Sequence, residues 1–282
     1  MYTIMGVTGQ VGAAVANTLL AANEQVRVVV RDTQKGAAWA AQGCEVAVAD
    51  ATDLQSLAAA FKNSQGVFIL LPPNFDPVEG FPQTREIIAN IHQALAMTRP
   101  GKVVCISTIG AQASQPNLLN QLQLLEQSLH QLDLPITFLR PAWFMENHQW
   151  DIEAAKSGVI PSFLQPLDKP VPMIATLDVG RTAAELLRET WQGKRVVELQ
   201  ATETVTPDSI AQAFTELLGH PVRMQVVPRD TWEGLFHSQG MHNPHPRMQM
   251  LDGFNEGWIC FEGVPRAGRV TFKEVLAGLL GR

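Results

Sequence analysis

The chain has 282 residues, of which 46% are hydrophobic and 17% are charged, and its formal net charge is −6. The hydrophobic fraction is typical of a folded globular protein and excludes an intrinsically disordered chain. The acidic balance excludes the concentrated basic surface that direct binding of nucleic acids requires.

Short β-branched runs alternate with helical segments over the first half of the chain. Nearly all residues of these runs are apolar, which is typical of strands covered by helices on both faces. Such alternation predicts parallel strands joined by right-handed crossover helices, so we expect an α/β fold with a Rossmann-type doubly wound sheet. The expected strands are Tyr2–Met5, Val26–Val30, Glu45–Val48, Val67–Leu71, Val103–Ser107 and Ile136–Leu139.

The first expected strand leads into a glycine-rich turn, G-x-x-G-x-x-G, formed by Gly6, Gly9 and Gly12. Between a strand and a helix, one such glycine permits the tight turn, one lets a diphosphate approach the backbone, and one lets the helix pack closely. The diphosphate then binds free N–H groups at the positive end of the helix dipole. A purely structural turn is the alternative. In this context the pattern predicts binding of a nicotinamide dinucleotide.

Arg31 and Asp32 directly follow the second expected strand. An acidic residue near this place binds the ribose 2′-hydroxyl of NAD, whereas arginine accommodates the 2′-phosphate of NADP. A guanidinium forms forked, charge-assisted hydrogen bonds with a phosphate, and Lys35 is close enough to contribute. We therefore expect NADP(H) as the cofactor. In the alternative, Arg31 is a solvated surface residue and Asp32 binds the ribose of NAD(H).

Two further turns follow the third and fourth expected strands, at Asp50 and Ala51 and at Leu71 and Pro72. Ligands of a doubly wound sheet lie beyond the carboxyl ends of its strands. We expect the first turn to line the adenine and the second to line the path to the nicotinamide. Asp53 is either part of this site or the N-cap of the next helix.

The pattern changes after Pro141, and prolines and glycines become dense over residues 158–172. A further helix is expected from Leu177 to Trp191, followed by a strand from Val196 to Leu199. Residues 237–246 show no apolar periodicity, so a long loop is predicted there.

This change of pattern predicts a nucleotide-binding Rossmann domain over residues 1–145 and a smaller α/β lobe that binds substrate over residues 146–282. The segments near 177–200 are expected to return to the Rossmann core, because a helix followed by a strand continues the alternation of the first half.

A series of motifs extends along nearly the whole chain. They are G-V-T-G-Q-V-G from Gly6 to Gly12, V-V-V-R-D from Val28 to Asp32, V-A-D-A-T-D from Val48 to Asp53, I-L-L-P-P from Ile69 to Pro73, I-S-T from Ile106 to Thr108, L-R-P-A-W-F-M-E-N from Leu139 to Asn147, T-L-D-V-G-R from Thr176 to Arg181, and G-H-P-V from Gly219 to Val222, followed by the pair Val227 and Pro228. In their order and spacing the chain resembles the NmrA-like branch of the atypical short-chain dehydrogenase/reductases. This branch includes NADP-binding redox sensors and bacterial NADPH-dependent quinone reductases.

The resemblance implies an NADP-binding core and a small C-terminal lobe that closes a cleft over the nicotinamide. It also implies that the stretch from Pro141 to Asn147 lines the substrate side, with Trp143, Phe144 and Asn147 as substrate-binding candidates. By position, the implied cofactor contacts are Thr8, Gly9, Gln10 and Val11 at the pyrophosphate, Arg31 at the 2′-phosphate, Asp50 and Ala51 at the adenine, and Leu71 and Pro72 beside the nicotinamide.

The chain lacks the Y-x-x-x-K pair of ordinary short-chain dehydrogenases, in which lysine lowers the pKa of tyrosine so that the phenol moves a proton. Its single tyrosine is Tyr2, at the start of the first strand, so that mechanism is excluded. A quinone accepts hydride into an aromatised, charge-delocalised product that solvent protonates, and positioning alone is then sufficient. We expect an NADPH-dependent oxidoreductase acting on a quinone or a similar electrophilic acceptor.

No catalytic residue is firmly assigned, and the candidates are Ser107, Thr108 and His148. The two hydroxyls either donate toward the nicotinamide or a substrate oxygen, or bond to their own backbone. His148 either relays a proton or is structural. Trp143 and Phe144 form either an apolar wall for an aromatic acceptor or ordinary core packing.

The alternative function is a non-catalytic NmrA-like redox sensor, whose affinity for a protein partner depends on which dinucleotide is bound. In the enzymatic interpretation, the only partner is a small-molecule acceptor. His237, His242 and His245 match no familiar zinc spacing, so no metal site is expected.

The three cysteines, Cys44, Cys105 and Cys260, form no C-x-x-C pair, which indicates reduced thiols rather than disulfides. No apolar run reaches the roughly 18 residues that cross a bilayer, and the first expected strand leaves no room for a signal peptide. We therefore expect a cytoplasmic protein without a membrane anchor.

Overall fold

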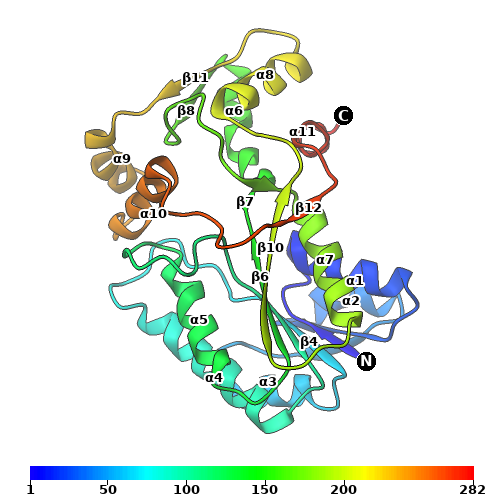
Figure 1. The fold of residues 1–282 in the computed structure, drawn as a ribbon. Coiled ribbons are helices and arrows are strands. Elements are labelled where there is room, and N and C mark those ends of the chain that lie inside the picture. Colours follow the sequence, from blue (N-terminus) through cyan, green and yellow to red (C-terminus); the bar gives the residue numbers. More distant parts are fainter.

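The computed structural model describes residues 1–282. Its centre is a sheet of eight parallel strands in the order β12-β10-β6-β5-β4-β1-β2-β3. All six strands expected in the first half are present, and the α/β Rossmann-type fold is confirmed (Figure 1). The bounds are β1 Tyr2–Ile4, β2 Val26–Val30, β3 Glu45–Val48, β4 Gly66–Ile69, β5 Val103–Ile106, β6 Ile136–Pro141, β10 Lys194–Ala201 and β12 Arg266–Gly268.

Helices cover both faces of this sheet (Figure 1). On one face, a buried cluster joins Val15 of α1, Trp39 of α2 and Val179 of α7 to the strands. On the other, Leu57 of α3, Ile91 of α4 and Leu125 of α5 complete a second cluster. The bounds are α1 Gln10–Ala21, α2 Thr33–Ala40, α3 Leu54–Phe61, α4 Pro82–Thr98, α5 Asn120–His130 and α7 Thr176–Arg188.

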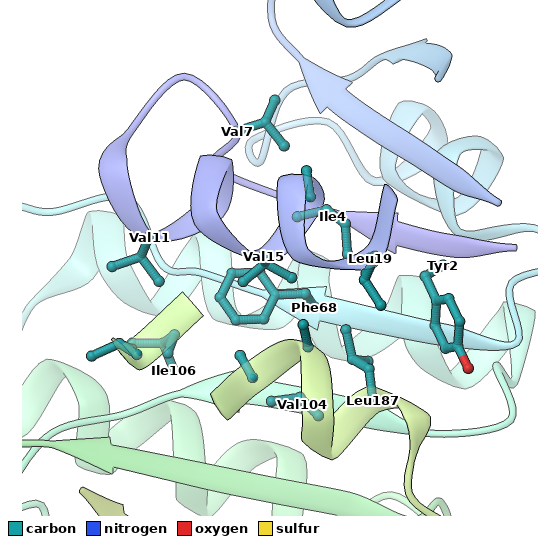
Figure 2. Close-up of a cluster of buried hydrophobic side chains, with 14 of the residues drawn as sticks. Tyr2, Ile4, Val7, Val11, Val15, Leu19, Phe68, Val104, Ile106 and Leu187 are labelled. Atoms are coloured by element: carbon teal, nitrogen blue, oxygen red, sulfur yellow. The ribbon is translucent and has the colours of Figure 1, made fainter. Parts of the chain in front are cut away.

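The helices α1 and α7 lie against each other at very close range. A Cβ atom on Gly180 would lie 2.3 Å from the Cβ of Ala14, so α7 packs in this position only with glycine there. Figure 2 shows Val11, Val15 and Leu19 of α1 with Leu187 of α7 over the strand residues Phe68 and Val104. This packing places the first residues of α7 beside the glycine-rich turn.

A second group of elements lies beyond the carboxyl ends of the strands (Figure 1). It has its own buried cluster, which includes Phe214, Trp232 and Phe236. Two short parallel pairs belong to this part, β8 with β11 and β7 with β9. The bounds are β7 Trp143–Phe144, the 3₁₀ helix η1 Met145–Asp151, α6 Ile152–Lys156, β8 Val159–Ser162, β9 Met173–Ile174, α8 Pro207–Leu218, β11 Arg223–Val226, the 3₁₀ helix η2 Arg229–Thr231, α9 Trp232–Ser238, α10 His245–Glu256 and α11 Phe272–Leu279.

Two sequence expectations are wrong in detail. Residues 237–246 do not form a long loop, because α9 extends to Ser238 and α10 begins at His245. Apolar residues of both helices, such as Phe236 and Met248, pack within the C-terminal cluster. The strand β3 is not covered on both faces, since Glu45 and Val48 are exposed at the edge of the sheet.

The helix and strand expected near residues 177–200 return to the Rossmann core, where α7 packs on one face of the main sheet and β10 is one of its strands. The division of the chain into residues 1–145 and 146–282 remains a proposal. No helix combines the length and the apolar character that spanning a membrane requires.

Asp76 connects the loop after β4 to the link between α9 and α10. Its carboxylate accepts hydrogen bonds from the backbone N–H groups of His242 at 2.9 Å and Asn243 at 2.6 Å, and it contacts the ring Nδ1 of His242 at 2.9 Å. The hydrogen bond from the backbone of His242 is the largest cause that lowers the pKa of Asp76, to about 2. The two parts of the molecule are thus joined near the end of β4.

Candidate functional site

The three glycines of the turn after β1 have different roles. Gly6 has a φ of +72°, which side chains rarely tolerate, and its carbonyl accepts a hydrogen bond from Gly9 N at 3.0 Å. A Cβ on Gly12 would lie 2.3 Å from the Gly6 carbonyl oxygen and 2.8 Å from that of Met5. Gly12 therefore allows α1 to start directly against the end of β1, as the sequence pattern predicts.

The first turn of α1 has backbone donors without acceptors. Gly9 is the N-cap and supplies no side chain, and the N–H groups of Gln10, Val11 and Gly12 make no hydrogen bond within the protein. Thr8, Gly9 and Gln10 are exposed to solvent, whereas the side chain of Val11 is buried in the core. Unpaired amides at the positive end of a helix, approached through glycine, fit the diphosphate of a dinucleotide.

The residues after β2 favour one of the two sequence interpretations. Asp32 is the N-cap of α2, and its carboxylate accepts a hydrogen bond from Gln34 N at 2.9 Å. Arg31 and Lys35 are exposed and make no ion pair or side-chain hydrogen bond. A carboxylate engaged in capping is less available to a ribose, and a free guanidinium is suited to a phosphate.

The turn after β3 lies close to Arg31. Asp50 accepts hydrogen bonds from Thr52 N at 2.8 Å and Thr52 Oγ1 at 2.7 Å. These bonds are the main causes that lower the pKa of Asp50, and the charge of Arg31 adds to them. Asp53 is the N-cap of α3 and accepts from Gln55 N at 3.0 Å, so its two interpretations resolve in favour of the cap.

The turns expected beside the adenine and the nicotinamide each combine a buried and an exposed residue. Ala51 is buried and its carbonyl accepts from Asn90 Nδ2 at 3.2 Å. Leu71 is buried, and Pro72 is exposed after the end of β4. Both turns follow strands at the carboxyl edge that also carries the glycine turn, so the cofactor candidates lie along one edge of the sheet.

Neither hydroxyl at the end of β5 is a free donor. Ser107 is 3% exposed and donates its hydroxyl proton to Glu126 on α5. Thr108, which is less buried, donates to the carbonyl of its neighbour Ile109 at 3.1 Å. The backbone-bonding interpretation fits Thr108, and Ser107 belongs to a larger buried network.

The centre of that network is Arg140 on β6. Its guanidinium binds both carboxylate oxygens of Glu126, at 2.8 Å and 2.7 Å, and also contacts Glu262. Burial opposes the charged form, but the hydrogen bonds and charges of these two carboxylates raise the pKa of Arg140 above its ordinary value. Glu198 on β10 lies 3.9 Å away and accepts from the backbone of Glu262 and Gly263.

Sequence reasoning missed this network, although a charged residue inside an otherwise apolar strand, L-R-P, was a signal for it. A surface depression of about 640 Å³, lined in part by Glu198, Glu262 and Val264, lies next to the network. Because β6, β5 and β4 separate β10 from β1, this depression is not part of the candidate cofactor site.

The substrate-binding candidates follow β6 and face different surroundings. Trp143 is half-buried and its ring meets that of Phe254 on α10 edge-on, with centroids 5.1 Å apart. Its indole N–H is buried without an acceptor. Phe144 packs against the core of the main sheet, and Asn147 is exposed.

His148 points into the C-terminal part. Its Nδ1 lies 2.7 Å from the carboxylate of Asp151, and its ring packs edge-on against Phe272 on α11. The other ring nitrogen, Nε2, is buried without a partner. This packing between η1 and α11 fits a structural role for His148.

Sequence reasoning also missed Glu146 and Thr176. The Glu146 carboxylate accepts hydrogen bonds from Thr176 N, at 2.8 Å and 3.0 Å, and from Thr176 Oγ1 at 2.6 Å. Thr176 Oγ1 also lies 3.4 Å from Oε1 of Gln10 in the glycine turn. Glu146 thus binds the N-terminus of α7, where a negative charge is favourable.

The three histidines of the predicted loop lie beside two different carboxylates. His242 contacts Asp76 at 2.9 Å, whereas His245 and His237 lie 3.4 Å and 3.9 Å from Glu233. No group of three or more His, Cys, Asp or Glu side chains has a geometry suited to a metal ion.

The sequence of the chain is similar to those of known reductases. The chain is 26% identical over 244 residues to quinone oxidoreductase 2 of Escherichia coli K12, covering 86% of this chain and 82% of the relative. It is 25% identical over 233 residues to a (4-alkanoyl-5-oxo-2,5-dihydrofuran-3-yl)methyl phosphate reductase of Streptomyces griseus, covering 82% and 78%.

Solved structures share the whole fold. Triphenylmethane reductase of Citrobacter sp. superimposes with a TM-score of 0.83 at 21% identity, covering 100% of this chain and 99% of the other. The NADPH complex of the Escherichia coli quinone oxidoreductase QOR2 gives 0.79 at 23% identity, covering 100% and 95%. The sequence profile of the NmrA-like family matches residues 2–254. The chain therefore belongs to the NmrA-like family.

Proposed function

We propose that this protein is an NADP(H)-dependent oxidoreductase that transfers hydride from NADPH to a quinone or a similar electrophilic acceptor. The observation that carries the proposal is the glycine turn, where three successive backbone N–H groups lack acceptors. The neighbouring strand β2 is followed directly by the exposed, unpaired Arg31. Two relatives support it by name, a quinone oxidoreductase and a (4-alkanoyl-5-oxo-2,5-dihydrofuran-3-yl)methyl phosphate reductase. Two of the similar structures were determined with NADP(H) or NADPH bound.

The residues present fit this cofactor. The amides of Gln10, Val11 and Gly12 would bind the diphosphate, and Arg31 with Lys35 would bind the 2′-phosphate. Asp50 and Ala51 would lie at the adenine, and Leu71 and Pro72 beside the nicotinamide. When bound, NADPH supplies the hydride.

The protein's contribution to the reaction is to bind and align the two reactants rather than to transfer a proton. The hydroxyls of Ser107 and Thr108 already donate within the protein, and the single tyrosine is buried in β1. Transfer of the hydride to a quinone carbonyl oxygen gives an aromatic hydroquinone monoanion directly, and the remaining phenolate oxygen takes its proton from solvent. Such an acceptor needs no protein acid, and this chemistry matches the residues found here.

The acceptor side of the site is assigned to the segment after β6. Trp143 and Phe144 offer apolar aromatic surface, and Asn147 offers an exposed amide. With this assignment, residues 146–282 supply most of the substrate-binding lobe and residues 1–145 the cofactor-binding domain. A cytoplasmic location accompanies the proposal as a prediction.

An acceptor screen tests the proposal directly. The absorbance of NADPH at its nicotinamide band is followed with a panel of quinones and with other hydride acceptors. We expect turnover above a control that contains cofactor and protein without acceptor. Tight NADPH binding with no turnover on any acceptor would reject the enzymatic function and favour the redox-sensor function, in which the oxidised and reduced cofactors must bind with different affinities.

Replacing Arg31 tests the choice of cofactor. We expect Arg31→Ala to weaken NADP(H) binding by about 1.5–3 kcal/mol, the value of hydrogen bonds to a charged group, and to leave NAD(H) binding nearly unchanged. Calorimetric titration with both dinucleotides measures this, and Arg223→Ala, at an exposed arginine on β11, is the matched control. Equal affinity of the unmodified protein for both dinucleotides would show that Arg31 does not select the phosphate.

A further inference from the structure

Three segments that are far apart in sequence meet at the N-terminus of α7. Gln10 belongs to the glycine turn, Thr176 opens α7, and Glu146 follows the short strand β7. Thr176 contacts both of the others through one atom, Oγ1, at 2.6 Å from Glu146 and 3.4 Å from Gln10. Thr176 is buried, so its hydroxyl has few other partners available.

The contact between Thr176 and Glu146 is the stronger part of this arrangement. Both carboxylate oxygens accept from the Thr176 backbone N–H, and one also accepts from its hydroxyl. Charge-assisted hydrogen bonds of this kind are about twice as strong as neutral ones. The position of Glu146 is therefore tied to α7, and α7 packs on α1 without space for a side chain at Gly180.

Glu146 is in turn part of the segment that carries the acceptor candidates. Trp143 and Phe144 precede it in β7, which pairs with β9 just before α7. Asn147 follows it and is exposed. A carboxylate this near to the expected diphosphate is electrostatically unfavourable for cofactor binding, so cofactor affinity does not account for it.

We propose that Glu146 and Thr176 are positioning residues, which hold the segment 143–147 at a fixed offset from the glycine turn and so align the acceptor with the nicotinamide. The inference rests on the proposed function, since it assigns the glycine turn to the cofactor and this segment to the acceptor. In this arrangement, a ligand bound at the amide of Gln10 also restrains residues 143–151.

The central variant is Thr176→Val, which removes both Oγ1 contacts and keeps the backbone N–H that Glu146 binds. We expect the Kd for NADPH to change by less than about threefold and kcat to fall about 10- to 100-fold, because misplacement of reactants by about 1 Å costs this much. Amide hydrogen exchange gives a second readout that needs no turnover. NADP⁺ is expected to protect residues 10–14 in both proteins, but residues 143–151 only in the unmodified one.

Substitutions at Glu146 separate positioning from a merely structural role. Glu146→Ala removes the carboxylate that accepts from the N–H and the hydroxyl of Thr176, so segment 143–147 is no longer tied to α7, and kcat is expected to fall as in Thr176→Val. Glu146→Gln keeps an acceptor for the backbone N–H and releases the Thr176 hydroxyl for Gln10, so kcat is expected within about threefold of the unmodified value. Glu153→Gln, on α6 with an exposed ion pair to Lys156, is the control and should change neither readout. Thermal unfolding verifies that each variant is folded.

The inference is overturned if folded Thr176→Val retains the kcat and the protection of residues 143–151 of the unmodified protein. It is also overturned if Glu146→Gln loses as much kcat as Glu146→Ala. An unmodified protein that binds NADPH but reduces no acceptor rejects the proposed function alone, and the exchange measurement still decides the coupling. A protein that binds no dinucleotide overturns both proposals.

Discussion

Gly12→Ala is expected to remove most of the dinucleotide affinity of the protein. The added Cβ would lie 2.3 Å from the carbonyl oxygen of Gly6, 2.4 Å from its carbonyl carbon and 2.8 Å from the oxygen of Met5. All of these atoms are backbone, so no side-chain rotation relieves the overlap. The first turn of α1 must move away from β1, and its unpaired amides move with it.

The expected loss follows from the bonds at stake. Each amide that binds the diphosphate is worth about 1.5–3 kcal/mol as a hydrogen bond to a charged group, so displacement of two of them lowers the affinity for NADPH about a hundredfold or more. Overpacking between α1 and β1 also costs about 1–3 kcal/mol of stability. Calorimetric titration with NADPH and thermal unfolding measure the two effects separately.

Gly234→Ala is the matched control for this variant. Gly234 lies within α9, and a Cβ there meets no atom within 4 Å. We expect unchanged NADPH binding and a stability equal to or above that of the unmodified protein, because alanine is favoured over glycine in helices by about 0.5–1 kcal/mol. NADPH binding by Gly12→Ala with unmodified affinity would remove the glycine turn from the cofactor site.

Arg140→Met is expected to lower the free energy of unfolding more than Gly12→Ala does. The Arg140 side chain is 6% exposed, and its guanidinium forks onto Glu126, whose side chain is 13% exposed. Removing the positive charge leaves buried carboxylates without compensation, which costs about 3–5 kcal/mol when one partner of a buried pair is lost. Because Ser107 donates to the same carboxylate, the end of β5 is expected to loosen as well.

Urea unfolding followed by tryptophan fluorescence measures this loss. The double variant Arg140→Met with Glu126→Met is expected to recover part of it, because replacing both partners by apolar residues of similar volume is often neutral. Arg188→Met is the surface control, since Arg188 is half-exposed in its ion pair with Glu24, and such pairs contribute about 0–1 kcal/mol. A stability of Arg140→Met within about 1 kcal/mol of the unmodified protein would mean that the network contributes little net energy.

Much of the main sheet and of the geometry of the candidate cofactor site was predictable from local sequence. The strands β2 and β3 have the bounds that the apolar runs indicate, and the other strands of the first half differ from them by one or two residues at an end. The roles of Gly6 and Gly12 follow from the short strand-turn-helix connection, in which backbone geometry depends on neighbours close in sequence. The exposed, unpaired side chain of Arg31 fits both interpretations of this residue, so its contact with the 2′-phosphate stays a prediction.

The C-terminal part was much less predictable. Its cluster is drawn from many separate helices, strands and connections, and α9 has only seven residues, too few for the repeated apolar stripe that indicates a helix. This is why residues 237–246 resembled a loop, although both ends of that stretch are helical.

Composition, the alternation of strands and helices, and the glycine turn were sufficient for the fold class and for the position of the candidate diphosphate site, because these features depend on residues a few positions apart. The partners of Arg140, Glu146 and Ser107 were not predictable in this way. Arg140 meets Glu262 across 122 positions of sequence, and Thr176 meets Gln10 across 166. Side chains so far apart in sequence meet only after the strands have paired and the helices have packed. Until then, each polar side chain has many possible partners, and the folded backbone decides which of them comes within hydrogen-bond distance.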